Sequence, residues 1–206
     1  MVKLYGVKPS NYYSLVKAIL IEKNIDFIEV PTPPSQDEDF LLKSPMGRMP
    51  AIEVNGTFLS ESLAIAYWAE QVQPDPALLP QDPLAAAKVL ELVYHIKLNV
   101  ELVARRCLPA AFFGAAISDE LRETTWTDLQ RGMKAVDRIF VGEPFAAGSR
   151  LTLADFVTFY TFGLAGGIVE KIYDKKLLGD YAGIQKVMET MAHHPSIARV
   201  ELEKAA

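Results

Sequence analysis

The segment 44–62 constrains the fold more than any other part of the chain. Within it, Asn55-Gly56 separates the apolar runs 51–54 and 57–59. This dipeptide is the strongest short signal for a β-hairpin, because both residues tolerate the positive φ angles of a type I′ turn. We therefore expect the two runs to pair as antiparallel strands.

Two further features flank this hairpin. Pro50 precedes the first strand, where a proline is tolerated because it need not donate a ladder hydrogen bond, and its peptide bond with Met49 can be held in the cis form. Ser60-Glu61-Ser62 follows the second strand and precedes a run of apolar residues at helical spacing. A helix that begins here leaves backbone N–H groups unpaired, and such a terminus is a ready site for an anion.

The residues before the hairpin predict a strand, a helix and a second strand, the pattern of a parallel βαβ unit with a right-handed crossover. A further one or two helical turns are expected at 37–43, and a helix at 62–72. Together the elements give the order βαβαββα, the thioredoxin-like arrangement of an α/β domain. The first strand, first helix and second strand are predicted at 3–7, 12–23 and 25–30.

A proline-rich segment then interrupts the pattern. Residues 73–83 contain four prolines and cannot continue a helix or a sheet. We place a linker at 75–83, between a thioredoxin-like domain at 1–74 and an all-α C-terminal domain at 84–206. No alternating strand pattern follows the linker.

The C-terminal part is predicted to be helical throughout. A helix at about 84–108 carries two apolar stripes, which predicts burial on two sides. One stripe is expected to face the helical core, and the other the first domain, a ligand cleft or a second subunit. A second long helix is expected at 118–140. Thr152 and Asp155 form a variant of the capping box, with Asp in the place of Glu or Gln, directly before another apolar run.

Composition excludes several classes of function. The net charge is −5 with the charges interspersed, so no basic stripe suited to nucleic acid is present. Cys107 is the only cysteine, which excludes an intramolecular disulfide and a Cys-x-x-Cys site and fits a cytoplasmic setting. The longest run without charges, 156–169, is shorter than the roughly 18 residues of a membrane helix, so we expect no membrane partner. His193-His194 lacks the spacing of metal ligands, so we expect no metal site.

The order of these devices resembles the cytosolic glutathione transferases, with serine-type bacterial members of the theta, zeta and beta kind as the nearest pattern. The resemblance rests on Met49-Pro50 and Glu61-Ser62, on the linker-like segment 76–83, and on the capping motif 148–155. It implies glutathione as co-substrate and a homodimer. It also implies that the residue before a cis-proline binds the cysteinyl part of glutathione, while an acidic-Ser pair holds the γ-glutamyl end.

Conjugation by an enzyme of this family requires glutathione as a thiolate, because the thiolate and not the thiol is the nucleophile. Ser10 matches the position of the activating serine in the serine classes, and Asn11 is a helper or substitute donor. The alternative is that either residue merely caps the following helix. Tyr5 is the second candidate for the hydroxyl, since tyrosine classes place it near the end of this strand.

Further binding residues follow from the same resemblance. Arg48 lies where the family contacts the glycine end of glutathione, and a guanidinium suits a carboxylate; Lys43 is a possible assistant. Both could equally be solvated surface charges. The resemblance implies that the second substrate binds near the side chains of Tyr12, Tyr94, Leu98, Arg105 and Phe112, with Phe113 beside them. The alternative for most of these residues is a place in the core.

The sequence thus predicts a glutathione transferase that attacks a small, apolar electrophile, which the sequence does not name. Two alternatives stay open: a non-catalytic binding or regulatory protein of the same fold, and a glutathione-dependent peroxidase or isomerase. Ser10 is followed by Asn11-Tyr12 in place of the Ser-Ser-Cys of maleylacetoacetate isomerases, which disfavours that isomerase activity. No cysteine replaces the serine, which disfavours thiol transfer.

Overall fold

The computed structural model describes residues 1–205. These residues form two compact units, described separately below. The first contains Met1–Leu78 together with residues 193–205, and the second is Leu79–Ala192.

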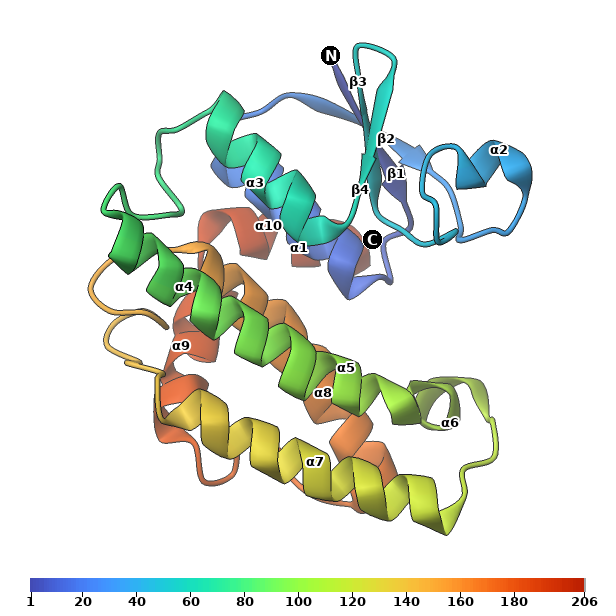
Figure 1. Ribbon diagram of the computed structural model, residues 1–206, viewed down its shortest axis with the longest axis vertical. Helices are drawn as coiled ribbons and strands as arrows, with labels where there is room; N and C mark the ends of the chain where they lie inside the picture. The colour runs from blue at the N-terminus through green and yellow to red at the C-terminus, as the bar shows by residue number, and fades with distance from the viewer. Residues whose placement is uncertain (206) are drawn as a thin grey trace. The chain divides into compact units, whose positions relative to one another are not determined.

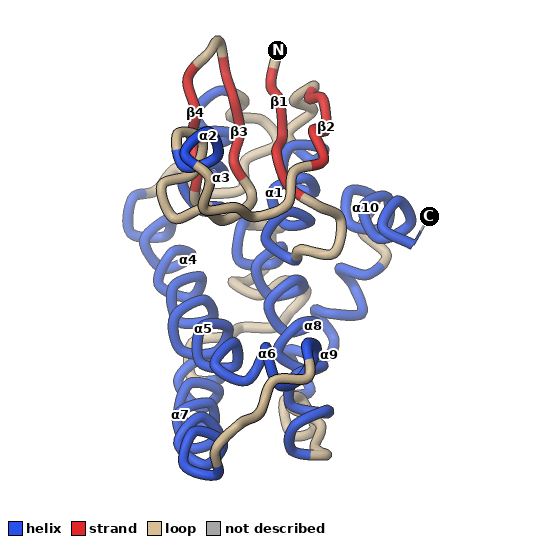
Figure 2. The backbone as a smooth tube through the Cα atoms, turned by 90° about the vertical axis from the view of Figure 1, so that its right-hand side faces the viewer, coloured by secondary structure: helices blue, strands red, loops and turns tan. Residues whose placement is uncertain are grey.

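The first unit is built on a four-stranded mixed sheet with the order β2-β1-β3-β4 (Figure 2). The strands are β1 Val2–Gly6, β2 Phe27–Pro31, β3 Ala51–Val54 and β4 Thr57–Ser60. β1 pairs parallel with β2 and antiparallel with β3, which pairs antiparallel with β4. Asn55 and Gly56 have φ angles of 50° and 81°, as the predicted hairpin turn requires.

Helices cover both faces of this sheet. α1 (Asn11–Glu22) and α3 (Ser62–Val72) lie on one side, and the short α2 (Glu38–Leu41) lies on the other (Figure 1). Apolar side chains from the sheet and from α1 and α3 are fully buried and form the core of the unit: Leu4, Leu15, Leu20, Ile52 and Ile65. The predicted thioredoxin-like βαβαββα order is confirmed.

The C-terminal helix α10 (Pro195–Ala205) packs against α1 and belongs to this first unit. Lys17 of α1, almost fully buried, forms ion pairs with Glu29 of β2 and Glu203 of α10. The predicted range 84–206 assigned this helix to the C-terminal domain. The long-range ion pair that draws the helix to α1 has no signature in local sequence.

The second unit consists of helices. A nearly continuous helical rod runs through α4 (Pro83–Ile96), the π-helical turn η1 (Lys97–Glu101), α5 (Leu102–Ala104), the 3-10 turn η2 (Arg105–Cys107) and α6 (Leu108–Phe113). It is followed by α7 (Asp119–Asp137), α8 (Leu153–Tyr173) and α9 (Ala182–Ala192). The rod extends beyond the predicted end at 108, so Phe112 and Phe113 are helical and do not lie in a loop.

One of the two predicted apolar stripes on this rod is buried, and the other is not. The buried stripe comprises Val89, Leu92, Val93, Ile96, Val100 and Val103. On the second stripe, Tyr94 and Leu98 are about half exposed, at 50% and 53%. The predicted core stripe is therefore confirmed, and the second stripe, predicted to face the first domain, a ligand cleft or a second subunit, stays a prediction.

The η1 turn carries a buried network of charges. Glu101, fully buried, accepts hydrogen bonds from Lys97 at 2.7 Å, from Thr161 at 2.7 Å and from Arg105 at 3.1 Å. A buried carboxylate is tolerated only when it is paired and hydrogen-bonded. These contacts fix the irregular turn against α8.

α8 is the central helix of the second unit and begins with the predicted capping interaction. The Asp155 carboxylate accepts hydrogen bonds from the backbone N–H of Thr152 at 2.7 Å and from that of Ala146 at 2.6 Å. By length and composition α8 could cross a membrane, and 67% of its most apolar window is buried within the structure. Such burial is also typical of the core helix of a globular unit.

Candidate active site

Three loops meet at one edge of the sheet. Because β1 and β3 are antiparallel, Tyr5 near the end of β1 pairs with Ala51 at the start of β3, and Ala51 pairs with Ser60 at the end of β4. The segments that follow β1, precede β3 and follow β4 therefore leave the sheet at the same edge. They carry Ser10-Asn11, Met49-Pro50 and Glu61-Ser62, so the topology brings these predicted site residues together.

Ser10 is the N-cap of α1. Its backbone is extended, and its Oγ accepts a hydrogen bond from the Tyr13 N–H at 3.3 Å. Accepting this bond leaves the hydroxyl proton available for a second partner. The first turn of α1, residues 11–14, holds no acidic side chain, so the positive end of the helix dipole faces this loop without a neutralising carboxylate.

The Met49-Pro50 peptide bond is cis, as the sequence analysis allowed. Arg48 is exposed, and its backbone N–H donates to the Ser44 Oγ at 3.3 Å. Lys43 donates to the Asp39 carbonyl at 2.6 Å, and its ammonium lies 5.4 Å from the centre of the Phe58 ring. Lys43 thus has local partners, whereas the Arg48 side chain extends into solvent.

The N-terminus of α3 has an unusual backbone. Glu61 is exposed and has φ 69° and ψ 116°, a combination that a non-glycine residue rarely adopts. Such strain costs about 1–3 kcal/mol and persists where the surroundings hold it, often at a binding site. No side chain caps this terminus in the described structure, and an uncapped helix N-terminus can accept an anion. Ser62, the next residue, is buried.

Tyr5 lies near the same edge, but its hydroxyl is engaged elsewhere. It donates to the Glu53 carboxylate at 2.5 Å, and Glu53 also pairs with Lys3. Since Glu53 lies opposite Lys3 in the ladder, the hydroxyl points back along the strand. Burial, followed by the hydrogen bond to Glu53, raises the pKa of Tyr5 to about 12.

The residues predicted for the second substrate divide between the two units. Tyr12, half buried, belongs to the first unit. In the second unit, Tyr94 and Leu98 are exposed one turn apart, and Arg105 is paired with Glu101. Phe112 is 43% exposed, with the Lys171 ammonium 4.7 Å from its ring centre. The role of these residues stays a prediction.

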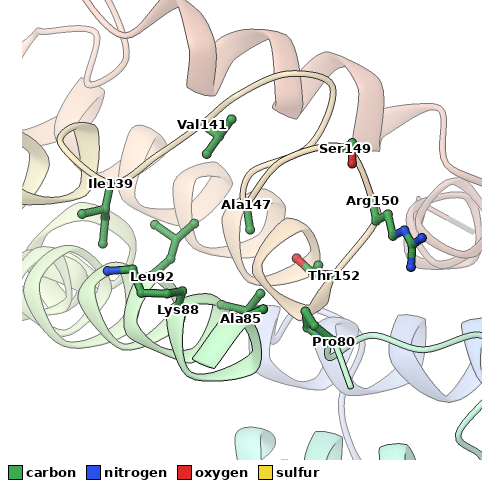
Figure 3. A pocket seen from close by; sticks show the side chains of 11 residues that line it. Pro80, Ala85, Lys88, Leu92, Ile139, Val141, Ala147, Ser149, Arg150 and Thr152 are labelled. Atoms are coloured by element: carbon green, nitrogen blue, oxygen red, sulfur yellow. The ribbon is translucent and has the colours of Figure 1, made fainter. Parts of the chain in front are cut away.

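Sequence reasoning missed an apolar pocket of about 420 Å³ in the second unit, between α4 and the loop before α8 (Figure 3). Leu92, Ile139 and Val141 form its wall, while the charged ends of Lys88 and Arg150 point away from its centre. Its lining comes from segments more than forty residues apart, so no local pattern signals it.

Among residues 1–205, no group of three or more His, Cys, Asp or Glu side chains could hold a metal ion.

Comparison with known proteins agrees with this geometry. Residues 4–77 match the family of the glutathione S-transferase N-terminal domain, and residues 114–200 match that of the C-terminal domain. A glutathione S-transferase from Pseudomonas putida is 37% identical over 206 residues, covering all of this chain and 94% of that protein.

More distant relatives extend the comparison. A probable maleylacetoacetate isomerase from Drosophila melanogaster is 27% identical over 74% of this chain and 64% of that protein. A glutathione transferase homologue from Sulfitobacter, solved with bound glutathione, has a TM-score of 0.78 and 21% identity over 98% of both chains, which shows the shared fold. By both family matches and by the full-length likeness to the Pseudomonas protein, the chain belongs to the glutathione S-transferase family.

Proposed function

We propose that this glutathione transferase activates glutathione as a thiolate through Ser10. The observation that carries the proposal is the meeting of three loops at one sheet edge, which places a hydroxyl, a backbone segment and an uncapped helix N-terminus together. The hydroxyl, the backbone segment and the helix N-terminus each complement one group of glutathione.

Each end of glutathione has a complementary group. The Glu61 carboxylate suits the ammonium of the γ-glutamyl end, and the unpaired N–H groups at the start of α3, where Ser62 lies, suit its carboxylate. The backbone of Met49, before Pro50, suits the cysteinyl part, and the Arg48 guanidinium suits the glycine carboxylate. Asn11 is proposed as a helper beside Ser10; Lys43 and Tyr5, which have partners of their own, are not given a role.

One hydroxyl is sufficient for the activation. A free thiol with a pKa of about 8.5 is only a few per cent ionised at pH 7. A hydrogen bond to a charged group contributes about 1.5–3 kcal/mol, and each 1.36 kcal/mol corresponds to one pKa unit. A bond from Ser10 to the thiolate therefore lowers the thiol pKa by about 1–2 units, which brings it near the operating pH.

The test is the ultraviolet absorption of the bound thiolate against pH in the wild type and in Ser10→Ala. We expect the wild type to show a thiol pKa about 1–2 units below that of free glutathione, and Ser10→Ala to lose this shift while still binding glutathione. A bound thiol with an unshifted pKa in the wild type would refute the proposal and favour a non-catalytic binding protein.

Two further variants separate activation from helix capping, because Ser10→Ala also removes a cap. Ser118→Ala removes an equivalent cap, since the Ser118 hydroxyl accepts from the Leu121 N–H at 3.2 Å. It should lower stability by about 0.5–2 kcal/mol and leave the thiol pKa unchanged. Ser10→Thr keeps a hydroxyl and should keep the lowered pKa. If Ser118→Ala changed the thiol pKa as much as Ser10→Ala does, the shift would reflect stability alone.

The same thiolate could serve an isomerase, and the likeness to the Drosophila protein favours this as a second candidate reaction. Assay of the purified protein with maleylacetoacetate and with a halogenated aromatic electrophile distinguishes the two. Because Asn11-Tyr12 follows Ser10, we expect turnover of the electrophile and little isomerisation. Turnover of maleylacetoacetate alone would reverse the assignment.

We also propose that the protein is a cytoplasmic homodimer that acts on a small apolar electrophile. The side chains of Tyr94 and Leu98, one helical turn apart and each at least half exposed in the single chain, support a further contact, because neighbouring large apolar groups on one surface often mark an interface. Cys107 as the only cysteine fits a reducing compartment. Sedimentation equilibrium tests the dimer; a monomer at micromolar concentration would contradict it.

A further inference from the structure

Two stretches of backbone meet directly before Met49-Pro50: Ser35-Gln36 and the turn at Gly47. We propose that this contact positions the part of the active site that binds the glycine end of glutathione, and thereby makes the enzyme select thiols with a free glycine carboxylate. The inference rests on the proposed function, in which Arg48 binds that carboxylate. All of these residues belong to the first unit.

The contact is made at Gly47. This residue is buried and has φ 62°, in the left-handed region. A Cβ at this position would lie 2.2 Å from the Ser35 carbonyl oxygen and 2.2 Å from the Gln36 Nε2. Because the carbonyl oxygen belongs to the backbone and cannot rotate away, only glycine allows the two segments to come this close.

Hydrogen bonds on both sides of Gly47 hold the turn. The Gln36 Nε2 donates to the Met46 carbonyl oxygen at 3.3 Å. The buried Ser44 accepts the Arg48 N–H through its Oγ at 3.3 Å and the Gly47 N–H through its carbonyl oxygen at 2.8 Å. These bonds fix the backbone from which the Arg48 side chain extends.

The other side of the contact is connected to α2 (Figure 1). The Ser35 Oγ accepts the N–H of Asp37, the residue before α2, at 3.0 Å. Within α2, Phe40 is buried, and its carbonyl oxygen accepts the Ser44 N–H at 2.9 Å. Both segments are thus tied to one buried side chain, and the contact at Gly47 closes the loop between them.

Arg48 depends on this turn for its position. Its side chain is exposed and forms no ion pair with any residue in 1–205. A guanidinium binds a carboxylate through two parallel hydrogen bonds, whose strength depends on their geometry. Only the glycine carboxylate of glutathione is proposed to meet Arg48, so displacement of the turn should remove this contact and leave the γ-glutamyl end bound.

The test compares glutathione with glutathione amide, in which an uncharged carboxamide replaces the glycine carboxylate, by calorimetric titration of the full-length protein. We expect the wild type to prefer glutathione about ten-fold or more, as for a hydrogen bond to a charged group. Gly47→Ala should lose most of this preference and keep the wild-type affinity for the amide. Equal binding of the two thiols by the wild type, or an unchanged preference in Gly47→Ala, would overturn the proposal.

Gly56→Ala is the matched control. Gly56 lies in the same unit and has φ 81°, but nothing lies within 4 Å of its Cβ position. The substitution therefore brings the strain of a left-handed residue without a clash, and should keep the wild-type preference for glutathione. An equal loss of preference in Gly56→Ala would assign the effect to reduced stability and overturn the positioning role.

Gln36→Ala keeps the proposal testable if Gly47→Ala does not fold, because the Gln36 side chain is exposed. Loss of its hydrogen bond to Met46 should lower the preference for glutathione by a factor of about two to ten. In an Arg48→Gln background it should have no further effect, because it acts through Arg48. An additional loss there would mean that the Gln36 amide contacts the ligand itself, and a wild-type preference in Gln36→Ala alone would also overturn its role.

Failure of this inference and failure of the proposed function give different results. A wild type that binds glutathione with a lowered thiol pKa, but whose preference ignores Gly47→Ala, overturns only the positioning role. A wild type that binds neither thiol overturns both. In turnover assays Gly47→Ala should raise KM for glutathione and keep kcat, because the change removes binding and leaves Ser10 in place; a lower kcat with unchanged KM would contradict the positioning role.

Discussion

Replacement of Gly132 by alanine is a sharp test of the helix packing in the second unit. Gly132 lies within α7, where helix propensity alone predicts that alanine stabilises by about 0.8–1.0 kcal/mol. The packing predicts the opposite sign. A Cβ would lie 2.0 Å from the Asn99 carbonyl oxygen and 2.8 Å from its carbonyl carbon.

The magnitude follows from what must move. Contacts of a Cβ below 3.0 Å are essentially absent from proteins, so the two helices must separate by about 1 Å at this point. The atoms that are struck belong to the backbone of η1 and cannot rotate away. Val100 and Leu129, fully buried nearby on the same two elements, would lose close packing. Overpacking of this kind costs about 1–3 kcal/mol.

The assay is urea denaturation followed by far-ultraviolet circular dichroism, with thermal unfolding as a second measure. For a chain of this size, 1 kcal/mol corresponds to about 2–4 °C, so we expect Gly132→Ala to melt about 2–12 °C lower. Gly163→Ala is the matched control, because Gly163 lies in α8, is exposed, and has nothing within 4 Å of its Cβ position. It should melt slightly higher. If both variants were stabilised alike, the close approach of α7 to η1 would be refuted.

Three further predictions concern buried polar groups and the pH profile. Lys23→Met removes the buried ammonium that pairs with the Glu70 carboxylate, so the free energy of unfolding should fall by about 3–5 kcal/mol. A loss below about 1 kcal/mol in urea denaturation would contradict this. The double variant Lys23→Met, Glu70→Leu should recover part of the lost stability. Asp155→Asn places an amide N–H₂ against backbone donors that include the Ala146 N–H, and should cost about 1–3 kcal/mol in the same assay, an unchanged midpoint being the contrary result. Since the pKa of Tyr5 is raised to about 12, its hydroxyl stays protonated throughout the assay range, and Tyr5→Phe should leave the pH–rate profile below pH about 10 unchanged; loss of an acidic or basic limb would return Tyr5 to the mechanism.

Local turn chemistry accounts for most of the fold that could be predicted. Asn55-Gly56 placed the hairpin, and the hairpin together with the preceding βαβ pattern brought the three site loops to one edge. The chain order of these elements was enough to group Ser10, Met49 and Glu61 without any distance. This part succeeded because turn preference and strand direction are properties of neighbouring residues.

The parts that could not be predicted depend on partners far along the chain. The choice between Ser10 and Tyr5 was open because the partner of the Tyr5 hydroxyl, Glu53, lies 48 residues away. The docking of α10 depends on Lys17 meeting Glu203, across almost the whole sequence. The close approach of α7 to η1 depends on Gly132 meeting the backbone of Asn99 on another helix, which no local pattern signals.

The charged side chains of this protein divide by whether they have a partner, and this division separates structure from ligand binding. Buried lysines are all paired where the structure describes them: Lys17 with Glu29 and Glu203, Lys23 with Glu70, Lys97 with Glu101. An unpaired buried charge would cost several kcal/mol, so these groups are committed to holding helices together.

The groups at the candidate active site have the opposite character. Arg48 and Glu61 are exposed, and neither forms an ion pair with any residue in 1–205. Glu61 also holds a strained backbone conformation with no capping bond to compensate for it. Because neither Arg48 nor Glu61 forms an ion pair within the described residues, binding of a ligand to these charges breaks no such pair. Glu61→Gln should therefore leave the free energy of unfolding within about 0.5 kcal/mol of wild type, as for an ordinary surface change, while glutathione affinity falls about ten-fold. A variant that lost stability and kept its affinity would place Glu61 among the structural charges instead.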